Sequence, residues 1–195
     1  MFDYGLTSGA SMKSDTQQIA IGLRQGEVVV LEALVEQYQY RLVRYLIYLL
    51  GRRDGVDDLV QETWLRVLER GSSYDGQSRF EPWLFRIARN IAVDAMRQRR
   101  IFSLDSNDDG GVRPAPASDE PSPFALASRT DDADRLARSL ETLEPVYREA
   151  LILRFQEDLS LQEISAIVGA PVSTVASRIY RGLATLRPHF EGETA

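Results

Sequence analysis

Apolar residues recur at every third or fourth position through most of this chain, and this spacing constrains the fold more than any other feature. Between residues 27 and 51 the repeated apolar positions are Leu31, Leu34, Val35, Tyr38, Leu42, Leu46 and Leu49. A helix has about 3.6 residues per turn, so these positions share one face and can be buried together. Strand-like alternation does not persist beyond a few residues anywhere. The sequence therefore predicts an all-α protein.

Turn and capping residues divide the first hundred residues into separate predicted elements. The first 14 residues carry no apolar pattern, and we expect a frayed start. Gly51 ends the helix at 27–51, and Asp54 is expected to cap a second helix that runs through Arg70. Residues 71–79 are rich in turn formers. A third helix is predicted from Glu81 to Arg100.

The helical pattern resumes near Leu136 and continues to the last residues of the chain. Pro145 suits the first turn of a helix that buries Val146, Ala150 and Leu153. Residues 160–163 (Ser-Leu-Gln-Glu) form a capping box, which predicts a short helix that Gly169 ends. The last helix is expected to begin at Pro171, with its buried face at Val172, Val175, Ile179, Leu183 and Leu186.

Residues 101–130 lack this periodicity and contain four prolines, so they predict a flexible linker. The chain carries a net charge of −6, and residues 103–134 contain eight acids but only two arginines. The segments on either side, 78–100 and 173–190, are basic. We therefore expect two small helical domains, at 15–100 and 131–190, joined by an acidic tether. Two basic surfaces of this kind suit a nucleic-acid partner.

The last two predicted helices have helix-turn-helix spacing, in which the second helix enters the major groove of DNA. Its side opposite the apolar stripe offers hydroxyls followed by cations, namely Ser173, Thr174, Ser177, Arg178 and Arg181. Hydroxyls near a helix start suit phosphates, and an arginine can bind guanine through two hydrogen bonds. We expect Arg178 to reach base edges and Arg181, nearly one turn further on, to meet phosphate. An ordinary helical hairpin with a solvated basic face remains the alternative.

The two earlier helices carry weaker functional patterns. Arg86, Asn90, Arg97 and Arg100 share one stripe of the predicted third helix, with Arg89 beside it, which suits single-stranded DNA. On the second helix, acids share a stripe with Leu65, which indicates a surface for a basic protein partner. A magnesium-dependent nuclease would instead need carboxylates that converge from several elements.

Some classes of protein are disfavoured by residue content. The chain has no cysteine and one histidine, His189, so thiolate or His/Cys zinc sites and a Ser-His-Asp triad are not expected. Neither a signal peptide nor an apolar run of about 20 residues is present, so we expect a cytoplasmic protein without membrane insertion. We expect no enzymatic activity, cofactor, metal or small-molecule substrate.

Three motifs resemble the extracytoplasmic-function (ECF) RNA polymerase sigma factors of the sigma-70 family. They are residues 57–67 (DDLVQETWLRV), residues 80–94 (FEPWLFRIARNIAVD), and the pair 161–164 (LQEI) and 169–178 (GAPVSTVASR). Their order and separation match that family over about residues 20–190. The resemblance implies two helical domains, region 2 and region 4.

The resemblance also implies partners and roles for particular residues. Contact with the clamp helices of the largest subunit of core RNA polymerase falls to Asp58, Gln61, Glu62 and Leu65. The −10 element of promoter DNA falls to Tyr74, Arg79, Arg86, Arg89, Asn90, Arg97 and Arg100, and the −35 element to the residues named on the last helix. Such factors are commonly held inactive by an anti-sigma factor, so we expect one here.

This chain departs from the family in its last helix, where Ser173 and Ala176 replace a glycine and a cation that many relatives carry. The aromatic cluster that larger sigma factors use for strand opening is mostly absent. Two rivals remain, a conventional helix-turn-helix regulator and the metal-dependent nucleic-acid enzyme. Only the sigma-factor interpretation accounts for residues 57–67.

Overall fold

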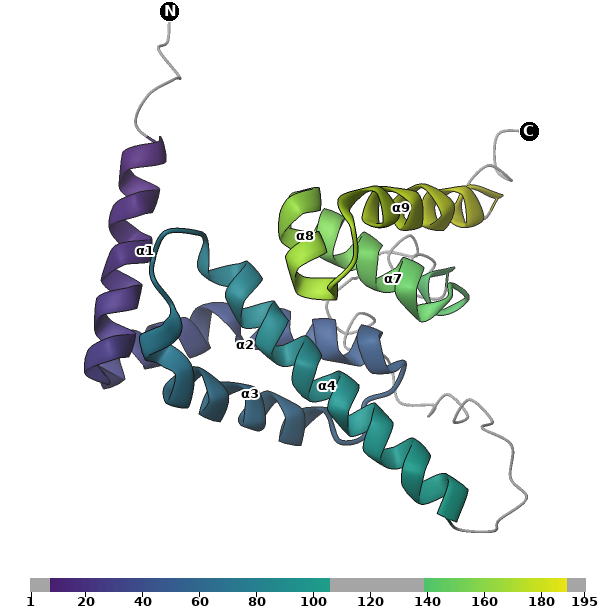
Figure 1. The fold of residues 1–195 in the computed structure, drawn as a ribbon, viewed down its shortest axis with the longest axis horizontal. Helices are drawn as coiled ribbons and strands as arrows, with labels where there is room; N and C mark the ends of the chain where they lie inside the picture. Colours follow the sequence, from purple (N-terminus) through teal and green to yellow (C-terminus); the bar gives the residue numbers. More distant parts are fainter. Residues whose placement is uncertain (1–7, 106–138, 189–195) are drawn as a thin grey trace, which may run out of the picture.

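The structure is a computed structural model that describes residues 8–105 and 139–188, with side chains described for 15–99 and 139–188. Every regular element in these ranges is helical, which confirms the all-α prediction (Figure 1). The elements are α1 (Ser8–Gln25), α2 (Val28–Leu50), α3 (Val56–Arg70), the short 3₁₀ turn η1 (Gly71–Ser73), α4 (Phe80–Asp105), α7 (Pro145–Leu151), the π-helix η2 (Ile152–Gln156), α8 (Leu161–Val168) and α9 (Val172–Leu186).

The helices α1 to α4 form an N-terminal bundle in which α2, α3 and α4 pack on one another. The apolar stripe of α2 is buried as predicted, with Leu42 and Leu46 fully enclosed. Phe80, the first residue of α4, closes one end of this core against Tyr38, at 5.4 Å between ring centroids. This ring contact therefore fixes how the start of α4 lies against α2.

The prediction of a frayed start is wrong for residues 8–14, because α1 begins at Ser8, whereas residues 1–7 lie outside the described residues. Ala20 and Leu23 of α1 are buried, and the helix contacts both α2 and η1. The Thr16 hydroxyl donates to the carbonyl oxygen of Gly76 at 2.9 Å, which ties α1 to the loop before α4. Its sequence lacks a strong apolar stripe because only a narrow face of α1 is covered.

The helix boundaries follow local chemistry at most ends. Gly51 ends α2 in the left-handed conformation (φ 66°), as its position predicts. The predicted capping role of Asp54 is wrong, since Gly55 occupies the N-cap position of α3. The Asp54 carboxylate instead accepts from Arg52 and Arg99, each at 3.1 Å.

At its other end α4 continues to Asp105, five residues into the segment expected to be linker. The rest of that expected linker, 106–130, lies outside the described residues, as do the side chain of Arg100 and residues 131–138 of the expected second domain.

The C-terminal bundle consists of α7, η2, α8 and α9. The capping box is confirmed: Ser160 Oγ accepts from the Glu163 amide at 3.3 Å, and Glu163 Oε2 accepts from the Ser160 amide at 2.7 Å. Gly169 ends α8 with φ 66°, also as predicted. Between α7 and α8, the Glu157 amide donates to the Ile152 carbonyl oxygen at 3.1 Å, a π-helical bond that sets the direction of residues 157–158.

Three residues that were predicted to be buried in this bundle are exposed. The buried face of α9 runs through Val175, Ile179, Gly182 and Leu186, because Gly182 lets α7 approach closely. Val172 and Leu183 lie off this line and are 37% and 45% exposed. Val146 of α7 is 39% exposed. The contact between α7 and α9 is thus rotated from the face that hydrophobicity alone predicts.

The two bundles pack on one another, with α8 against α4 and α7 against α2 (Figure 1). Buried side chains of both bundles belong to one continuous cluster. This contact determines which of the expected functional side chains are free.

Candidate functional site

The surface expected to bind polymerase lies on α3. Asp58, Gln61 and Leu65 are exposed on one face of this helix, and Leu65 is 54% exposed. Glu62 lies beside them, where its Oε1 accepts from Arg66 Nη2 at 2.9 Å. The opposite face of α3 carries Val60, Thr63, Trp64 and Val67 into the core. The helix therefore presents acids and an apolar residue outward together.

Leu68 belongs to the same surface, with an exposed fraction of 49%. Sequence analysis missed it, although it follows Leu65 by one helical step of three residues, which is the signal that could have found it. Among the described residues, these two adjacent leucines stay about half exposed beside acids. Such a surface is typical of a protein–protein contact.

On α4, Arg86, Asn90 and Arg97 are exposed along one face, as the spacing predicted. Arg86 has no polar partner in the described part of the chain, whereas Arg97 makes only a long, exposed contact of 3.8 Å with Asp94. This face can therefore accept an anion at Arg86 without breaking an ion pair, and at Arg97 by breaking only a long, exposed one.

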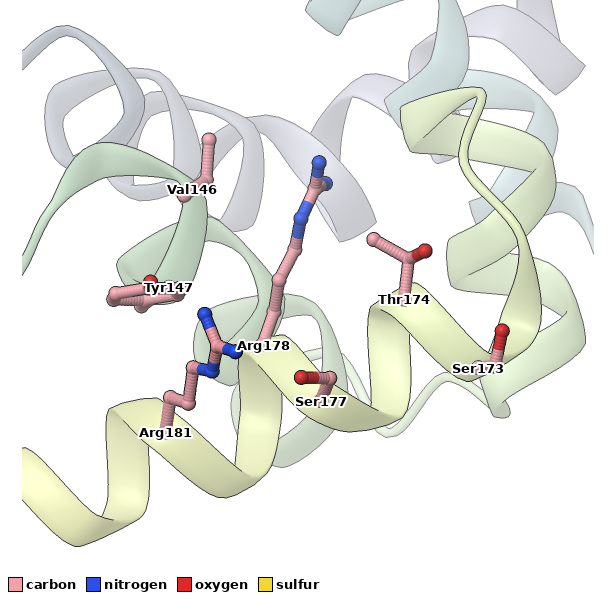
Figure 2. Close-up of a pocket in the computed structure, with 7 residues that line it drawn as sticks. All are labelled: Val146, Tyr147, Ser173, Thr174, Ser177, Arg178 and Arg181. Atoms are coloured by element: carbon pink, nitrogen blue, oxygen red, sulfur yellow. The ribbon is translucent and has the colours of Figure 1, made fainter.

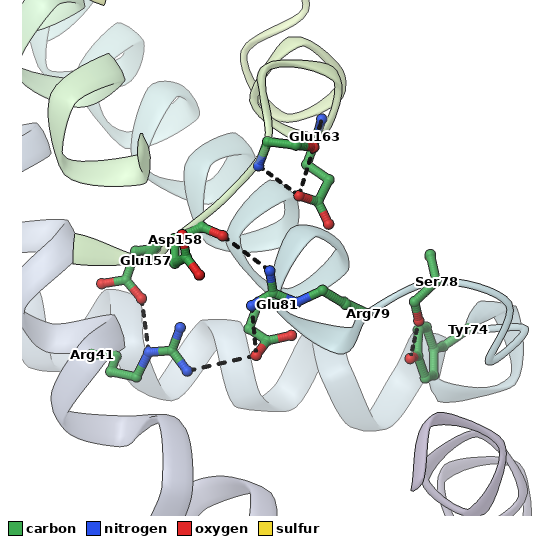
Figure 3. Close-up of polar contacts among 9 residues, drawn as sticks. Arg41, Tyr74, Ser78, Arg79, Glu81, Glu157, Asp158 and Glu163 are labelled. Atoms are coloured by element: carbon green, nitrogen blue, oxygen red, sulfur yellow. Dashed lines mark hydrogen bonds and ion pairs between the residues drawn. The ribbon is translucent and has the colours of Figure 1, made fainter. Parts of the chain in front are cut away.

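The structure contradicts an exposed stacking role for Tyr74. Its ring is 2% exposed and packs edge-on against Phe80 at 5.4 Å, while its hydroxyl donates to the Ser78 carbonyl oxygen at 2.6 Å (Figure 3). Burial raises the pKa of Tyr74 to about 12. The aromatic cluster of Tyr74, Phe80 and Trp83 needs this ring to close the end of the core, so no stacking face is free.

Arg79 and Arg89, also expected at the −10 element, contact the C-terminal bundle instead. Arg79 Nη1 donates to the Asp158 carbonyl oxygen at 3.0 Å (Figure 3). Asp158 has φ 51°, an uncommon value for a residue other than glycine, and this conformation directs the chain at the bundle contact. Arg89 Nε donates to Glu149 Oε1 at 2.8 Å.

Two buried glutamates of the C-terminal bundle are the centres of this contact. Glu157 has a fully buried side chain and accepts from Arg41 Nε at 2.7 Å (Figure 3). It also accepts from Arg44 Nη2 at 3.2 Å. Glu149, which is 3% exposed, accepts from Tyr45 as well as from Arg89. Sequence analysis missed both, because each looks like an ordinary helical acid until a distant segment covers it.

The helix-turn-helix consists of α8, a turn at Gly169–Ala170, and α9. Ser173, Thr174, Ser177, Arg178 and Arg181 lie together along one pocket, as expected, and Val146 and Tyr147 of α7 form its other wall (Figure 2). Tyr180, which sequence analysis missed, projects from α9 and is 74% exposed. Tyr180 follows Ala176 by four residues and lies off the apolar stripe, and this position could have indicated from the sequence that the ring is exposed.

Metal binding and membrane insertion bear on the alternative functions. Among the side chains described for 15–99 and 139–188, no group of three acidic or histidine residues is arranged to hold a metal ion. The same residues include no helix whose length and apolar content would let it cross a bilayer.

Comparison with known protein families gives two matches in succession. Residues 34–101 match the family model described as sigma-70 region 2, and residues 133–186 match that described as sigma-70, region 4.

Individual sigma factors are similar over most of the chain. It is 31% identical over 164 residues to the RNA polymerase sigma factor CarQ of Myxococcus xanthus, covering 84% of this chain and 91% of CarQ. It is 30% identical over 186 residues to the ECF RNA polymerase sigma factor SigC of Mycobacterium tuberculosis, covering 90% and 91%. With the ECF factor SigE of Mycolicibacterium smegmatis it shares 34% identity over 158 residues, covering 81% of this chain but only 60% of SigE.

Two solved structures have the same fold. The sigma factor RpoE in its complex with the anti-sigma factor NepR from Bartonella quintana superposes with a TM-score of 0.70 at 26% identity, over 83% of this chain and 97% of that one. CnrH, solved with the cytosolic domain of CnrY, gives a TM-score of 0.63 at 23% identity, over 92% and 99%.

Proposed function

Since the chain belongs to the ECF RNA polymerase sigma factors of the sigma-70 family, we propose that it binds core RNA polymerase and directs it to particular promoters. In this proposal it is a dissociable, non-catalytic subunit that acts in the cytoplasm. The N-terminal bundle serves polymerase binding and the −10 element, and the C-terminal bundle serves the −35 element.

The observation that carries this proposal is the outward surface of α3. Asp58, Gln61, Leu65 and Leu68 are exposed together, and the core accounts for none of them. A conventional helix-turn-helix regulator has no use for such a surface, whereas a subunit that docks on a basic helical partner does. Complementary charge sets the approach and the apolar residues supply burial.

The test reverses charge on this surface. In the double variant Asp58→Arg/Glu62→Arg, we expect loss of about 2–5 kcal/mol of binding free energy for core polymerase, because close interfacial charge pairs become repulsive. Competitive assembly of holoenzyme measures it, and circular dichroism checks that the helices remain. The control is Glu36→Arg, an exposed acid on α2. Wild-type assembly by the double variant would contradict the assignment of this surface.

For DNA, the proposal assigns the exposed face of α4 to the −10 element through Arg86, Asn90 and Arg97. Arg79 and Arg89 can join them only after the two bundles separate, because both now contact the C-terminal bundle. We therefore propose that the arrangement in Figure 1 precedes promoter binding and opens on the polymerase.

We also propose control by a separate anti-sigma protein. The similar RpoE was solved with its anti-sigma factor NepR, which supports this proposal. A tagged chain recovered from uninduced cells should carry a stoichiometric inhibitor. Recovery of polymerase alone, with constitutive transcription, would count against it.

A further inference from the structure

The pocket between α7 and α9 has a volume of about 410 Å³ and opens beside the helix expected to read DNA (Figure 2). Two of its lining residues, Arg178 and Arg181, are cations, and none is an acid. Neither arginine makes a hydrogen bond or ion pair with any described residue, in contrast to Arg41, Arg66 and Arg89, which all have carboxylate partners. The walls of the pocket therefore carry positive charge that no acid of the pocket neutralises, so the pocket can bind an anion.

The hydroxyl of Tyr147 adds a hydrogen-bond donor that comes from α7 and not from α9. It precedes Arg148 on α7, and Figure 2 shows its ring on the wall opposite the arginines. Gly182 holds the two helices close: a Cβ at that position would lie 2.9 Å from Leu151 Cδ1 and 3.4 Å from Tyr147 Cβ. The half-buried ring is thus fixed beside α9, and its hydroxyl has no partner among the described residues.

The Arg178 side chain leaves α9 at a different angle around the helix axis from the other polar residues of this helix. At about 100° per residue, Arg178 lies only about 70° from the centre of the buried face, whereas Ser177 lies almost opposite to it. Exposure agrees with this geometry, since Arg178 is half-buried and Ser177, Tyr180 and Arg181 are exposed. Arg178 therefore leans toward α7, away from the side of α9 that can enter a groove.

We propose that this pocket binds one backbone phosphate of duplex promoter DNA through the Arg178 guanidinium and the Tyr147 hydroxyl. Both groups donate to a non-bridging phosphate oxygen, and neither reads sequence. Arg181 also lines the pocket, and in the view of Figure 2 its guanidinium lies between Tyr147 and Arg178. Its side chain is exposed and can turn to the groove with Ser177 and Tyr180. This inference rests on the proposed −35 function. It reverses the base-reading role that the sequence alone suggests for Arg178, and it adds Tyr147 to the interface.

The test neutralises one phosphate at a time. A promoter fragment selected with wild-type holoenzyme is made with a single methylphosphonate at each position around the −35 element, and binding is measured for wild type, Tyr147→Phe and Arg178→Ala. We expect wild type to lose about tenfold in affinity at one particular phosphate, the size of one charge-assisted hydrogen bond. The same methylphosphonate should have a smaller effect on Tyr147→Phe, which keeps the arginine contact, and almost no further effect on Arg178→Ala.

Two further readouts make the result decisive. Arg178→Ala should weaken binding to all −35 sequences alike and lower the salt slope by about one unit. Arg24→Ala, which removes an exposed arginine of α1, is the matched control and should keep the wild-type profile. Tyr147→Phe retains the ring, so the packing of α7 on α9 is preserved.

The inference is overturned if every methylphosphonate weakens the two variants as much as it weakens wild type. It is also overturned if Arg178→Ala relaxes the preference at one base pair. A holoenzyme indifferent to every change in −35 sequence and phosphate would instead contradict the proposed function itself.

Discussion

Single buried side chains hold the two bundles together, and Tyr45, which is 1% exposed, is one of them. Its hydroxyl donates to Glu149 Oε1 at 2.9 Å, and its ring packs on Phe85 with centroids 5.1 Å apart. Burial, followed by the charge of Glu149, raises the pKa of Tyr45 well above 10. The phenol therefore stays protonated and donating at neutral pH. This contribution to stability is present below pH 10 and is lost as the pH rises through the raised pKa.

At this scale we predict that Tyr45→Phe lowers the free energy of unfolding by about 1–3 kcal/mol, because a buried carboxylate oxygen loses one of its donors. Urea denaturation at pH 7 measures the change. Tyr40→Phe is the matched control, since that side chain is 51% exposed, and it should stay within about 0.5 kcal/mol of wild type. Equal effects of the two substitutions would show that the hydroxyl contributes nothing to the bundle contact.

Among the elements, α1 depends most on close backbone approach. Gly76, in the loop before α4, has φ 71°, and a Cβ there would lie 2.9 Å from the Thr16 carbonyl oxygen and 3.1 Å from Ala20 Cβ. Gly26, between α1 and α2, has a similar φ of 68° but nothing within 4 Å. The two glycines share a conformational requirement, and only Gly76 is also restricted by its neighbours.

The two substitutions to alanine therefore form a matched pair. Both Gly26→Ala and Gly76→Ala should lose about 1–2 kcal/mol of stability, because a left-handed residue acquires a Cβ. Gly76→Ala should lose about 1–3 kcal/mol more, since α1 must move away from the loop. Thermal denaturation compares the two, and hydrogen exchange should rise across residues 16–23 in Gly76→Ala alone. Indistinguishable variants would mean that α1 does not depend on this contact.

For the whole molecule, the buried charge of Glu157 couples the two bundles. Its two arginine partners, Arg41 and Arg44, both belong to α2. Removal of one partner from a fully buried ion pair costs about 3–5 kcal/mol. Here that figure is an upper bound, because Arg41 and Arg44 are 26% and 21% exposed and Arg41 also lies 3.8 Å from Glu81. That bound is a large share of what a contact between two small bundles can supply.

We predict that Glu157→Gln, which preserves shape but removes the charge, separates the bundles while each keeps its helices. The chain contains no cysteine, so spin labels at Val29→Cys and Ala184→Cys report one distance between the bundles. That distance should lengthen and broaden in Glu157→Gln, and it should be unchanged in the control Glu62→Gln, whose ion pair with Arg66 lies within α3. An unchanged distance in Glu157→Gln would show that apolar packing alone holds the bundles together.

The helices themselves follow from short-range features that the sequence displays. The capping box at Ser160 and Glu163, the stop at Gly51 and the apolar stripe of α2 are all formed as predicted. Each depends on residues within a turn or two of one another, and local hydrogen bonds and one-sided burial determine them. The polar residues on the exposed faces of α3 and α9 were predictable for the same reason, whereas the exposed apolar residues Leu68, Val172 and Leu183 were not.

Which side chains remain free was decided only by tertiary packing. Tyr74 looks like a loop aromatic available to DNA, but Phe80 and Trp83 enclose it. Arg89 looks like part of a basic stripe, but Glu149, 60 residues away in sequence, pairs with it. The spacing of apolar residues along a helix indicates which of its faces is polar and which is apolar. It carries no information on which distant segment will cover that face, because burial of an arginine or a tyrosine depends on a partner that local sequence does not contain.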